Sequence, residues 1–171
     1  MDTNQATTRW SELAGIAVVS LADGKKVGTV DDFYFDPANS TLCALRVKTG
    51  MFGHKALKAA NINGIGQHAI TMANEELISK ESEDPKLSSF LLGHNLLSYK
   101  ILSAGGNIVG TVGNVLLDIS VPTALRIVAF ELSGGLRERL GGRYPTFGSN
   151  QVMRYGRDVL VVSDEVAQSL H

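Results

Sequence analysis

The sequence predicts an all-β protein made of two small β-barrels in tandem, each with a short C-terminal helix. Three observations predict this class: a segment that occurs twice, apolar residues that alternate with a period of two, and a composition rich in turn-forming residues. The 171 residues include 18 Gly and 4 Pro, and 44% are hydrophobic against 19% charged. This composition is typical of a globular chain with many reversals.

The clearest repeat is the segment Val-Gly-Thr-Val, which occupies residues 27–30 and recurs at residues 109–112. Across the longer windows 27–36 and 109–118, five of ten positions are identical. Both windows continue with three apolar residues and end on aspartate. A repeat of this kind indicates that one structural unit occurs twice in the chain.

Neighbouring segments follow in the same order at a growing offset. The aligned pairs are Leu13 with Leu91 and Ser20 with Ser98 at an offset of 78, Cys43 with Val128 at 85, and Ile62 with Val152 and Glu75 with Glu165 at 90. The central windows align at 82, so the second copy requires insertions of four, three and five residues. Each insertion falls in a turn-like stretch, where added length is tolerated. The sequence therefore predicts a first repeat at residues 9–80, an acidic linker at 81–87 and a second repeat at 88–171.

Each copy is expected to contain five or six short strands. In residues 41–49, Cys43, Leu45 and Val47 alternate with Arg46 and Lys48. This alternation predicts a half-buried strand, with Cys43 in the core as a small hydrophobe. The inward positions of the second copy are then Val128, Phe130 and Leu132.

Glycines indicate where the strands bend and where they turn. Gly28 and Gly110 lie inside strand-like runs, where glycine usually accompanies the bulge or bend that closes a small barrel. The turns before these strands are predicted at residues 22–24 and 104–106.

Polar residues end each copy. Asn74 and Asp164 are predicted helix N-caps, each followed by glutamate in the first turn, so short helices are expected at residues 75–79 and 165–170. The charged residues and proline of the linker predict a solvated connection.

This order of motifs resembles the PRC-barrel family. The residues that carry the resemblance are 13–15, Gly24, 27–30, Asp36, Gly50 and 66–72 in the first copy, and 91–93, Gly106, 109–112, Asp118, 134–135 and 156–162 in the second. The family includes the cytoplasmic domain of the photosynthetic reaction-centre H subunit and the C-terminal domain of a ribosome-maturation factor that binds a small-subunit protein. The resemblance implies a protein-docking barrel without catalysis.

The sequence contains no pattern typical of a catalytic, metal or cofactor site. The histidines are His54, His68, His94 and His171, and none has a second His or a Cys at ligand spacing. Cys43 is the single cysteine, and no Gly-x-Ser-x-Gly motif occurs. Residues 64–69 match Gly-x-Gly-x-x-Ala, but a strand follows them, so a turn is expected rather than a dinucleotide site. We therefore expect no enzyme activity, no metal and no cofactor.

The loops after the alternating strands combine apolar with basic side chains. The candidate partner-binding residues are Met51, Phe52, His54, Lys55, Leu136, Arg137, Arg139, Arg143, Tyr144 and Phe147. One interpretation is an exposed contact surface, because aromatic residues, Met and Arg are enriched at interfaces. The alternative is that the apolar members fold back and cap the barrel ends. A contact between the barrels, or in a homodimer, satisfies both interpretations.

Net charge and hydropathy limit the classes of partner and the location that the sequence predicts. The formal net charge of −1 gives no whole-molecule reason to expect nucleic acid. The arginine-rich second repeat keeps an RNA-associated, ribosome-maturation-like role as the alternative to protein docking. No apolar run has the length of a membrane span, and the polar N-terminus lacks the plan of a signal peptide, so a cytoplasmic protein is expected.

Overall fold

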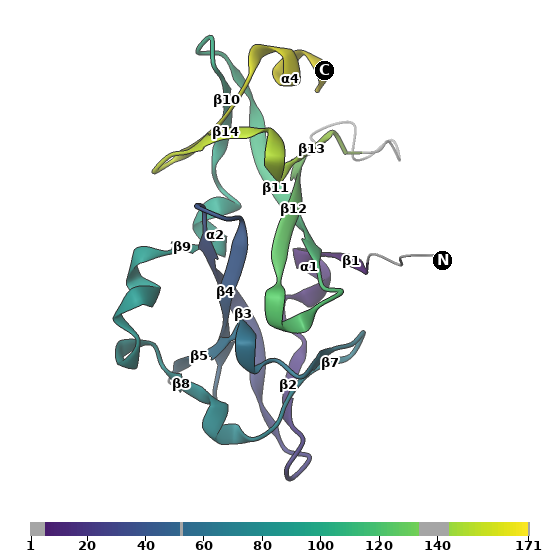
Figure 1. Ribbon diagram of the computed structural model, residues 1–171, viewed down its shortest axis with the longest axis vertical. Helices are drawn as coiled ribbons and strands as arrows, with labels where there is room; N and C mark the ends of the chain where they lie inside the picture. The colour runs from purple at the N-terminus through teal and green to yellow at the C-terminus, as the bar shows by residue number, and fades with distance from the viewer. Residues whose placement is uncertain (1–5, 52, 134–143, 171) are drawn as a thin grey trace.

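Strands dominate the protein, which confirms the mostly β class. The computed structural model describes residues 6–51, 53–133 and 144–170, in which the helices are short. The strands join into one curled sheet of 15 strands. The molecule is elongated, with most of the N-terminal half at one end and most of the C-terminal half at the other (Figure 1).

The first half contains eight of the strands. They are β1 (Thr7–Arg9), β2 (Ala17–Ser20), β3 (Lys26–Asp36), β4 (Thr41–Lys48), β5 (His54–Lys58), β6 (Gly64–Ile65), β7 (Ala69–Met72) and β8 (Ile78–Lys80). Helix α1 is Trp10–Leu13, and 3₁₀ turns lie at Ala59–Asn61, Glu75–Leu77, Glu81–Glu83 and Pro85–Ser89.

The second half contains the remaining strands. They are β9 (Leu91–Leu92), β10 (Lys100–Ser103), β11 (Ile108–Asp118), β12 (Arg126–Leu132), β13 (Thr146–Gly148), β14 (Val152–Tyr155) and β15 (Val159–Val162). The helices are α2 (Gly93–Leu96) and α4 (Asp164–Ser169), and 3₁₀ turns lie at Pro122–Ala124 and Ser149–Gln151.

The two halves share one pattern of strand pairing. In the first half β2 pairs antiparallel with β3 and parallel with β7, β4 lies between β3 and β5, and β6 pairs with β7. In the second half β10 pairs antiparallel with β11 and parallel with β15, β12 lies between β11 and β13, and β14 pairs with β15. A parallel pair needs a crossover connection, so its recurrence in the same place is a specific point of agreement.

Strand register corrects the alignment of the first segments. Val18 pairs with Gly28 and Ile101 pairs with Gly110, so β2 corresponds to β10 at an offset of 83. Ser20 therefore corresponds to Ser103, and the equivalence predicted with Ser98 is wrong. The pairing of Leu13 with Leu91 is wrong for the same reason, since Leu13 ends helix α1 and Leu91 begins strand β9. Hydrogen-bonded register decides equivalence, whereas a short Leu-x-Gly match does not.

Cys43 lies at a β-bulge rather than in the core. The register between β3 and β4 shifts between the pairs Tyr34–Ala44 and Phe35–Leu42, which leaves Cys43 as the extra residue. Cys43 is half-buried, and Leu42 takes the inward position. Beyond the bulge the alternation resumes as predicted, with Leu45 and Val47 buried. A bulge inserts one residue and so changes which side chains face inward.

The second half has the same bulge. The register between β11 and β12 shifts between the pairs Leu116–Ala129 and Leu117–Ile127, so Val128 is the extra residue. Val128 is half-buried, and Ile127 occupies the core in its place. The predicted equivalence of Cys43 and Val128 therefore agrees with the register, although neither residue is fully buried.

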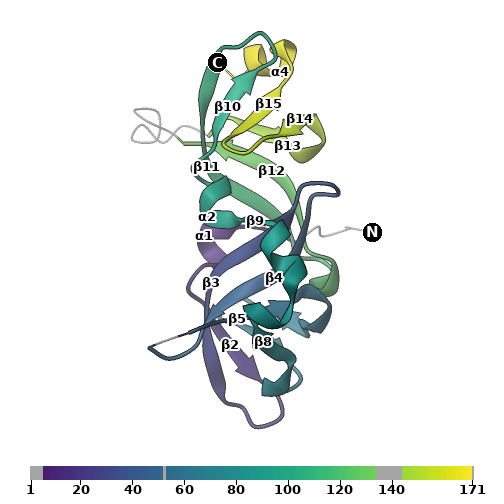
Figure 2. The same ribbon diagram turned by 90° about the vertical axis from the view of Figure 1, so that its left-hand side faces the viewer.

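Each half covers the other with its opening strand and helix. Strand β1 of the first half pairs with β11, and β9 of the second half pairs with β3. Helices α1 and α2 follow the same exchange and pack against β11 and β3. The exchanged elements cross between the halves in the middle of the molecule (Figure 2).

A hydrogen-bonded bridge also joins the halves. The Leu42 amide donates to the Leu125 carbonyl at 3.0 Å, and the Ile127 amide donates to the Ser40 carbonyl at 3.0 Å. Tyr155 packs edge-on against Phe35 with ring centroids 5.3 Å apart, and it lies 6.1 Å from Phe130. One core of buried side chains therefore spans both halves, so packing joins the halves in addition to the chain between them.

The first half does not end in a helix. Asn74 does act as a cap, because its side chain accepts a hydrogen bond from the Glu76 amide. The segment Glu75–Leu77 then makes a single 3₁₀ turn before β8, which pairs with β5. The expected helix at residues 75–79 is thus wrong, because the free edge of β5 recruits these residues as a strand.

The second half does end in the expected helix, α4. Its N-cap is Ser163 rather than Asp164, since the Ser163 hydroxyl accepts a hydrogen bond from the Val166 amide. The Asp164 carboxylate instead accepts a hydrogen bond from the Gly105 amide in the hairpin before β11.

Candidate functional site

The segment expected to be a solvated linker is held against the first half. Leu87 is buried in a small cluster with Tyr34, Ala44 and Ala56 on the outer face of the sheet. Asp84 forms a salt bridge with Lys58 at 3.3 Å. Strand β4 is consequently covered on both faces, which the one-sided alternation of its sequence did not predict.

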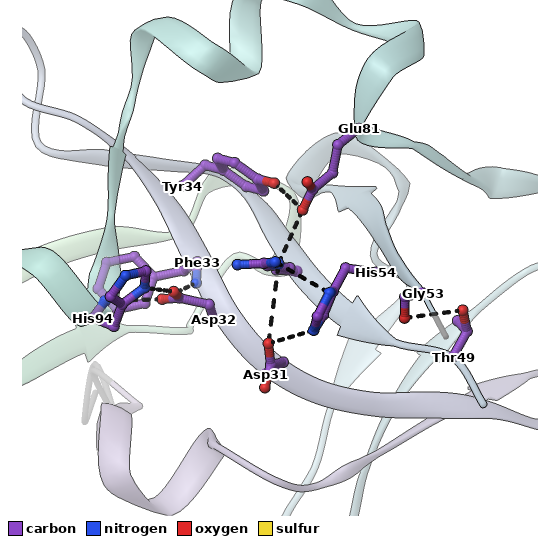
Figure 3. Close-up of polar contacts among 10 residues, drawn as sticks. Asp31, Asp32, Phe33, Tyr34, Thr49, Gly53, His54, Glu81 and His94 are labelled. Carbon is purple, nitrogen blue, oxygen red and sulfur yellow. Dashed lines mark hydrogen bonds and ion pairs between the residues drawn. The ribbon is translucent and has the colours of Figure 1, made fainter. Parts of the chain in front are cut away.

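Five polar side chains form a cluster beside this segment, and we call it the Arg46 cluster. It consists of Arg46 together with Asp31, Tyr34, His54 and Glu81, and Figure 3 labels the last four. Arg46 Nε lies 3.0 Å from Glu81 Oε1 and 4.0 Å from Asp31 Oδ2. The Tyr34 hydroxyl donates to the same Glu81 oxygen. Burial, together with the Glu81 carboxylate, raises the pKa of the Tyr34 phenol, which keeps it a hydrogen-bond donor.

His54 is the polar link between Arg46 and Asp31. Its Nδ1 lies 3.1 Å from Arg46 Nη2, and its Nε2 lies 3.1 Å from Asp31 Oδ2. Because arginine only donates, Nδ1 must accept, and Nε2 carries the proton that His54 donates to Asp31. All the polar groups of His54 are thus used in holding the cluster together.

Asp31 and Asp32 do not form a carboxylate pair. Asp31 is the extra residue of a bulge in β3 and faces the Arg46 cluster. Asp32 is buried and turns to the other side, where it accepts hydrogen bonds from the His94 amide at 3.1 Å and from the Phe33 amide at 2.8 Å (Figure 3). Its second oxygen lies 2.5 Å from His94 Nδ1. Asp32 therefore fastens helix α2 to strand β3.

The equivalent positions of the second half carry different charges. Strand register places Glu131 where the first half has Arg46. Glu131 is buried, and its Oε1 lies 3.0 Å from both Nε and Nη2 of Arg9. The guanidinium carbon of Arg9 lies 5.2 Å from the centre of the Tyr144 ring, a cation–π distance. In each half these polar groups bind a segment of the chain to the sheet.

The predicted loop residues are placed differently from one another. Met51 is 86% exposed, while Phe147 is buried and stacks on Phe130 with centroids 5.4 Å apart. Phe147 thus follows the capping interpretation. His54 belongs to the Arg46 cluster, and Lys55 and Tyr144 are half-buried. Four residues, together with Phe52, lie outside the described residues: Leu136, Arg137, Arg139 and Arg143.

Other apolar side chains are exposed where the sequence analysis did not place a site. The described residues include four besides Met51: Leu21, Ile108, Val121 and Met153. Met153 is 62% exposed on β14, the strand that ends the sheet order in the second half. Register shifts next to Met153, which identifies it as the extra residue of a bulge. Arg154 beside it is also exposed.

The single cysteine and the possible metal ligands are placed as follows. Burial raises the pKa of the Cys43 thiol, which disfavours the thiolate. Within residues 6–51, 53–133 and 144–170, no group of three or more His, Cys, Asp or Glu could hold a metal ion. None of the helices in these ranges is long and apolar enough to cross a membrane.

Glu81→Gln should increase local opening of strand β8 without unfolding the protein. Glu81→Gln removes the charge that Arg46 and Tyr34 share, so amide hydrogen exchange in Ile78–Lys80 should rise about five-fold, equivalent to about 1 kcal/mol. Glu83→Gln is the matched control, because Glu83 is exposed on the same 3₁₀ turn. Equal exchange rates in the two variants would contradict an anchoring role for Glu81.

Comparison with known proteins finds a family model that matches part of the chain. Residues 7–78 match the family model of the PRC-barrel domain. This range runs from β1 to the start of β8 and so includes the Val-Gly-Thr-Val segment and the three strands, β3, β4 and β5, that carry every member of the Arg46 cluster except Glu81. No curated protein matches the chain.

Proposed function

We propose that this protein, whose residues 7–78 belong to the PRC-barrel domain family, is a non-catalytic docking module built from two such repeats. Support for a second repeat comes from the strand pairings, which recur in the same order and with the same parallel pair. The shared bulges at Cys43 and Val128 add to it, because bulges are kept within families.

The polar clusters support a role in binding rather than in catalysis. Arg46, Glu81, Arg9 and Glu131 are all used to hold segments of the chain against the sheet. A catalytic site needs convergent polar groups that are left available to a substrate. Among the described residues, Arg46 and Arg9 are instead each engaged in a salt bridge within the chain, with Glu81 and Glu131 respectively.

The observation that carries the docking proposal is the free edge of β14. The strand pairs only with β15 among the described residues, and it presents Met153 and Arg154 to solvent. Exposed sheet edges accept strands from other chains. Methionine adapts to varied apolar partners, and arginine is enriched at interfaces.

The expected result is that Met153→Glu removes a bound protein that the wild-type chain captures. Wild type, Met153→Glu, Met51→Glu and a Leu136→Ala/Arg137→Ala double variant would each be used to capture partners from native-cell extract, with and without ribonuclease. Met51→Glu is the control for adding a charge at another exposed methionine. Loss with Met153→Glu alone assigns docking to β14, and loss with the double variant assigns it to the second loop.

Two outcomes of the same experiment oppose the proposal. Identical capture by all four chains would contradict docking through either surface. Capture that disappears with ribonuclease would favour the RNA-associated role, for which binding should also weaken steeply with salt.

A further inference from the structure

Tyr99 carries a phenol that has no hydrogen-bond partner among the described residues. The residue lies between α2 and β10 and is only 3% exposed. In the described ranges, the side-chain oxygens that are both fully enclosed and without a partner are those of Ser20 and Tyr155. The Tyr99 hydroxyl is not one of them, so it keeps access to solvent although nearly all of its side chain is covered. The Tyr34 hydroxyl, by contrast, donates to Glu81.

The accessible part of Tyr99 opens into a cleft of the second half. The cleft has a volume of about 570 Å³ and lies between β9, α2, β10 and the turn that joins β14 to β15. Strands β10, β14 and β15 lie together at one end of the molecule (Figure 2). Burial, and then the charge of Asp158 in the same cleft, raises the pKa of the Tyr99 phenol. The phenol therefore stays protonated at neutral pH and can donate a hydrogen bond into the cleft.

The charges of the cleft favour a singly charged anion. Lys100 and Arg157 contribute two cations against the single carboxylate of Asp158, and none of the three has an ion pair within the described residues. Arginine pairs with carboxylates and phosphates alike, but Asp158 repels a dianion more strongly than a monoanion. A carboxylate therefore suits the cleft better than a phosphate. Leu91 and Val159 also line the cleft and offer apolar surface to the carbon atoms beside the anion.

The first half shows that closing the barrel sheet does not require these polar groups. Ala17 pairs with Ala69 where Lys100 pairs with Val159, and the turn before each second partner closes with the same backbone hydrogen bond. The residues that stand in place of Tyr99, Lys100, Arg157 and Asp158 are therefore Ile16, Ala17, Gln67 and His68. A requirement of the fold would be met in both halves. The phenol and the two cations are instead particular to the second half, and they converge on one cleft.

We propose that the cleft beside Tyr99 binds a carboxylate, carried by an aspartate or glutamate side chain of a docking partner or by a free carboxylic acid. The Tyr99 hydroxyl and the Arg157 guanidinium donate hydrogen bonds to the carboxylate, and the Lys100 ammonium adds a second positive charge. Arg157 lies in the turn that follows β14, so the cleft adjoins the edge at which docking is proposed. The partner-borne form rests on that proposed function, whereas binding of a free acid does not.

The test is a titration of the ¹⁵N-labelled full chain followed by NMR. The probes are N-acetyl-glutamate-methylamide, acetate, inorganic phosphate and the uncharged N-acetyl-glutamine-methylamide. We expect saturable shifts of the amides of Tyr99, Lys100 and residues 156–158 with the first two probes, with affinities on the order of millimolar for so small a contact. Tighter binding of the glutamate derivative would indicate an acidic side chain of a partner, and equal affinities would indicate a free acid.

Tyr99→Phe removes the hydroxyl and keeps the ring. It should weaken binding of the glutamate derivative about ten-fold, since a hydrogen bond to a charged group is lost. The Tm should stay unchanged, because the hydroxyl has no partner within the described part of the chain. Tyr34→Phe is the matched control. It should leave the affinity unchanged and lower the Tm by about 2–4 °C, because Tyr34 loses its hydrogen bond to Glu81.

Charge variants test the other two groups of the cleft. Arg157→Gln introduces the residue type that the first half has at this position, and it should weaken binding of the glutamate derivative about ten-fold. Arg126→Gln removes the same charge outside the cleft and should leave the affinity unchanged. Asp158→Asn should strengthen binding about three-fold, because it removes a like charge.

Four results would each overturn the proposal. They are no saturable shift around Tyr99, unchanged affinity in Tyr99→Phe, equal shifts with the glutamine derivative, and tighter binding of phosphate than of acetate. The titration uses small probes and no partner protein. Its failure would therefore leave the capture result with Met153→Glu unaffected, and a failed capture experiment would leave the binding of acetate unaffected.

Discussion

Gly28→Ala is expected to lower the free energy of unfolding by about 3 kcal/mol, which corresponds to a Tm lower by about 6–12 °C. A Cβ atom at Gly28 would lie 2.3 Å from the Lys48 carbonyl oxygen and 2.8 Å from Val47 Cγ1. The first neighbour is backbone, so β3 and β4 must separate to make room. Chemical denaturation of the purified chain measures this change.

Gly110→Ala is the matched control in the second half. The two glycines occupy the same position of the repeated segment, and each pairs with the preceding strand: Gly28 with Val18 of β2, and Gly110 with Ile101 of β10. A Cβ at Gly110 would lie 3.0 Å from Leu132 Cδ2 and 3.5 Å from Leu132 Cγ. That methyl ends a flexible side chain, so the expected cost is below about 1 kcal/mol. Equal losses for the two variants would show that β3 and β4 adjust more freely than their packing indicates.

Asp32→Ala is expected to cost about 2–3 kcal/mol, because it removes the group that joins helix α2 to strand β3. The carboxylate is buried and accepts from two backbone amides, those of Phe33 and His94. The alanine variant leaves these donors without a partner, and each stranded donor is costly. Urea denaturation measures the loss, and faster hydrogen exchange in Gly93–Leu96 would locate it.

Two further variants separate the contribution that Asp32 makes as a hydrogen-bond acceptor for backbone amides from the contribution of its negative charge. Asp32→Asn keeps an oxygen for both amides, as Asn114 does for Val115 and Ser11 in the second half, so it should cost less than about 1 kcal/mol. Asn114→Ala should also cost less than about 1 kcal/mol, because both of its contacts with Ser11 are exposed: the Ser11 amide donates to Asn114 at 3.4 Å, and Asn114 Nδ2 donates to the Ser11 hydroxyl at 2.8 Å. If Asp32→Asn were as damaging as Asp32→Ala, the contact of the second oxygen with His94 would be the main contribution.

The exchange of opening elements explains why Asp32 matters beyond its own strand. Helix α2 follows the linker and belongs to the second half by sequence, yet it is held by β3 of the first half. The helix begins at Gly93, where a Cβ would lie 2.3 Å from the Phe33 ring. The position equivalent to Gly93 is Trp10, and the position equivalent to Phe33 is Val115. A large helix residue, Trp10, thus corresponds to a smaller strand residue, Val115. A small helix residue, Gly93, corresponds to a large strand residue, Phe33.

Local sequence patterns do not predict much of the candidate site. Arg46 appears in the sequence only as an outward residue of an alternating strand, and Glu81 only as one acid in a charged linker. Their salt bridge joins residues that a hairpin and three further strands separate along the chain.

The sequence by itself determined the mostly β class, the repeated Val-Gly-Thr-Val strand, the cap at Asn74 and the equivalence of Cys43 with Val128. These features depend on side-chain periodicity and on short contacts along the chain, which a sequence records directly. Tertiary structure alone decided that the opening elements exchange, that β4 and β12 meet in one sheet, and that residues 78–90 cover the first half. Those outcomes depend on which strand edge and which apolar face remain open once the sheets have formed, and residues far apart in sequence compete to cover them.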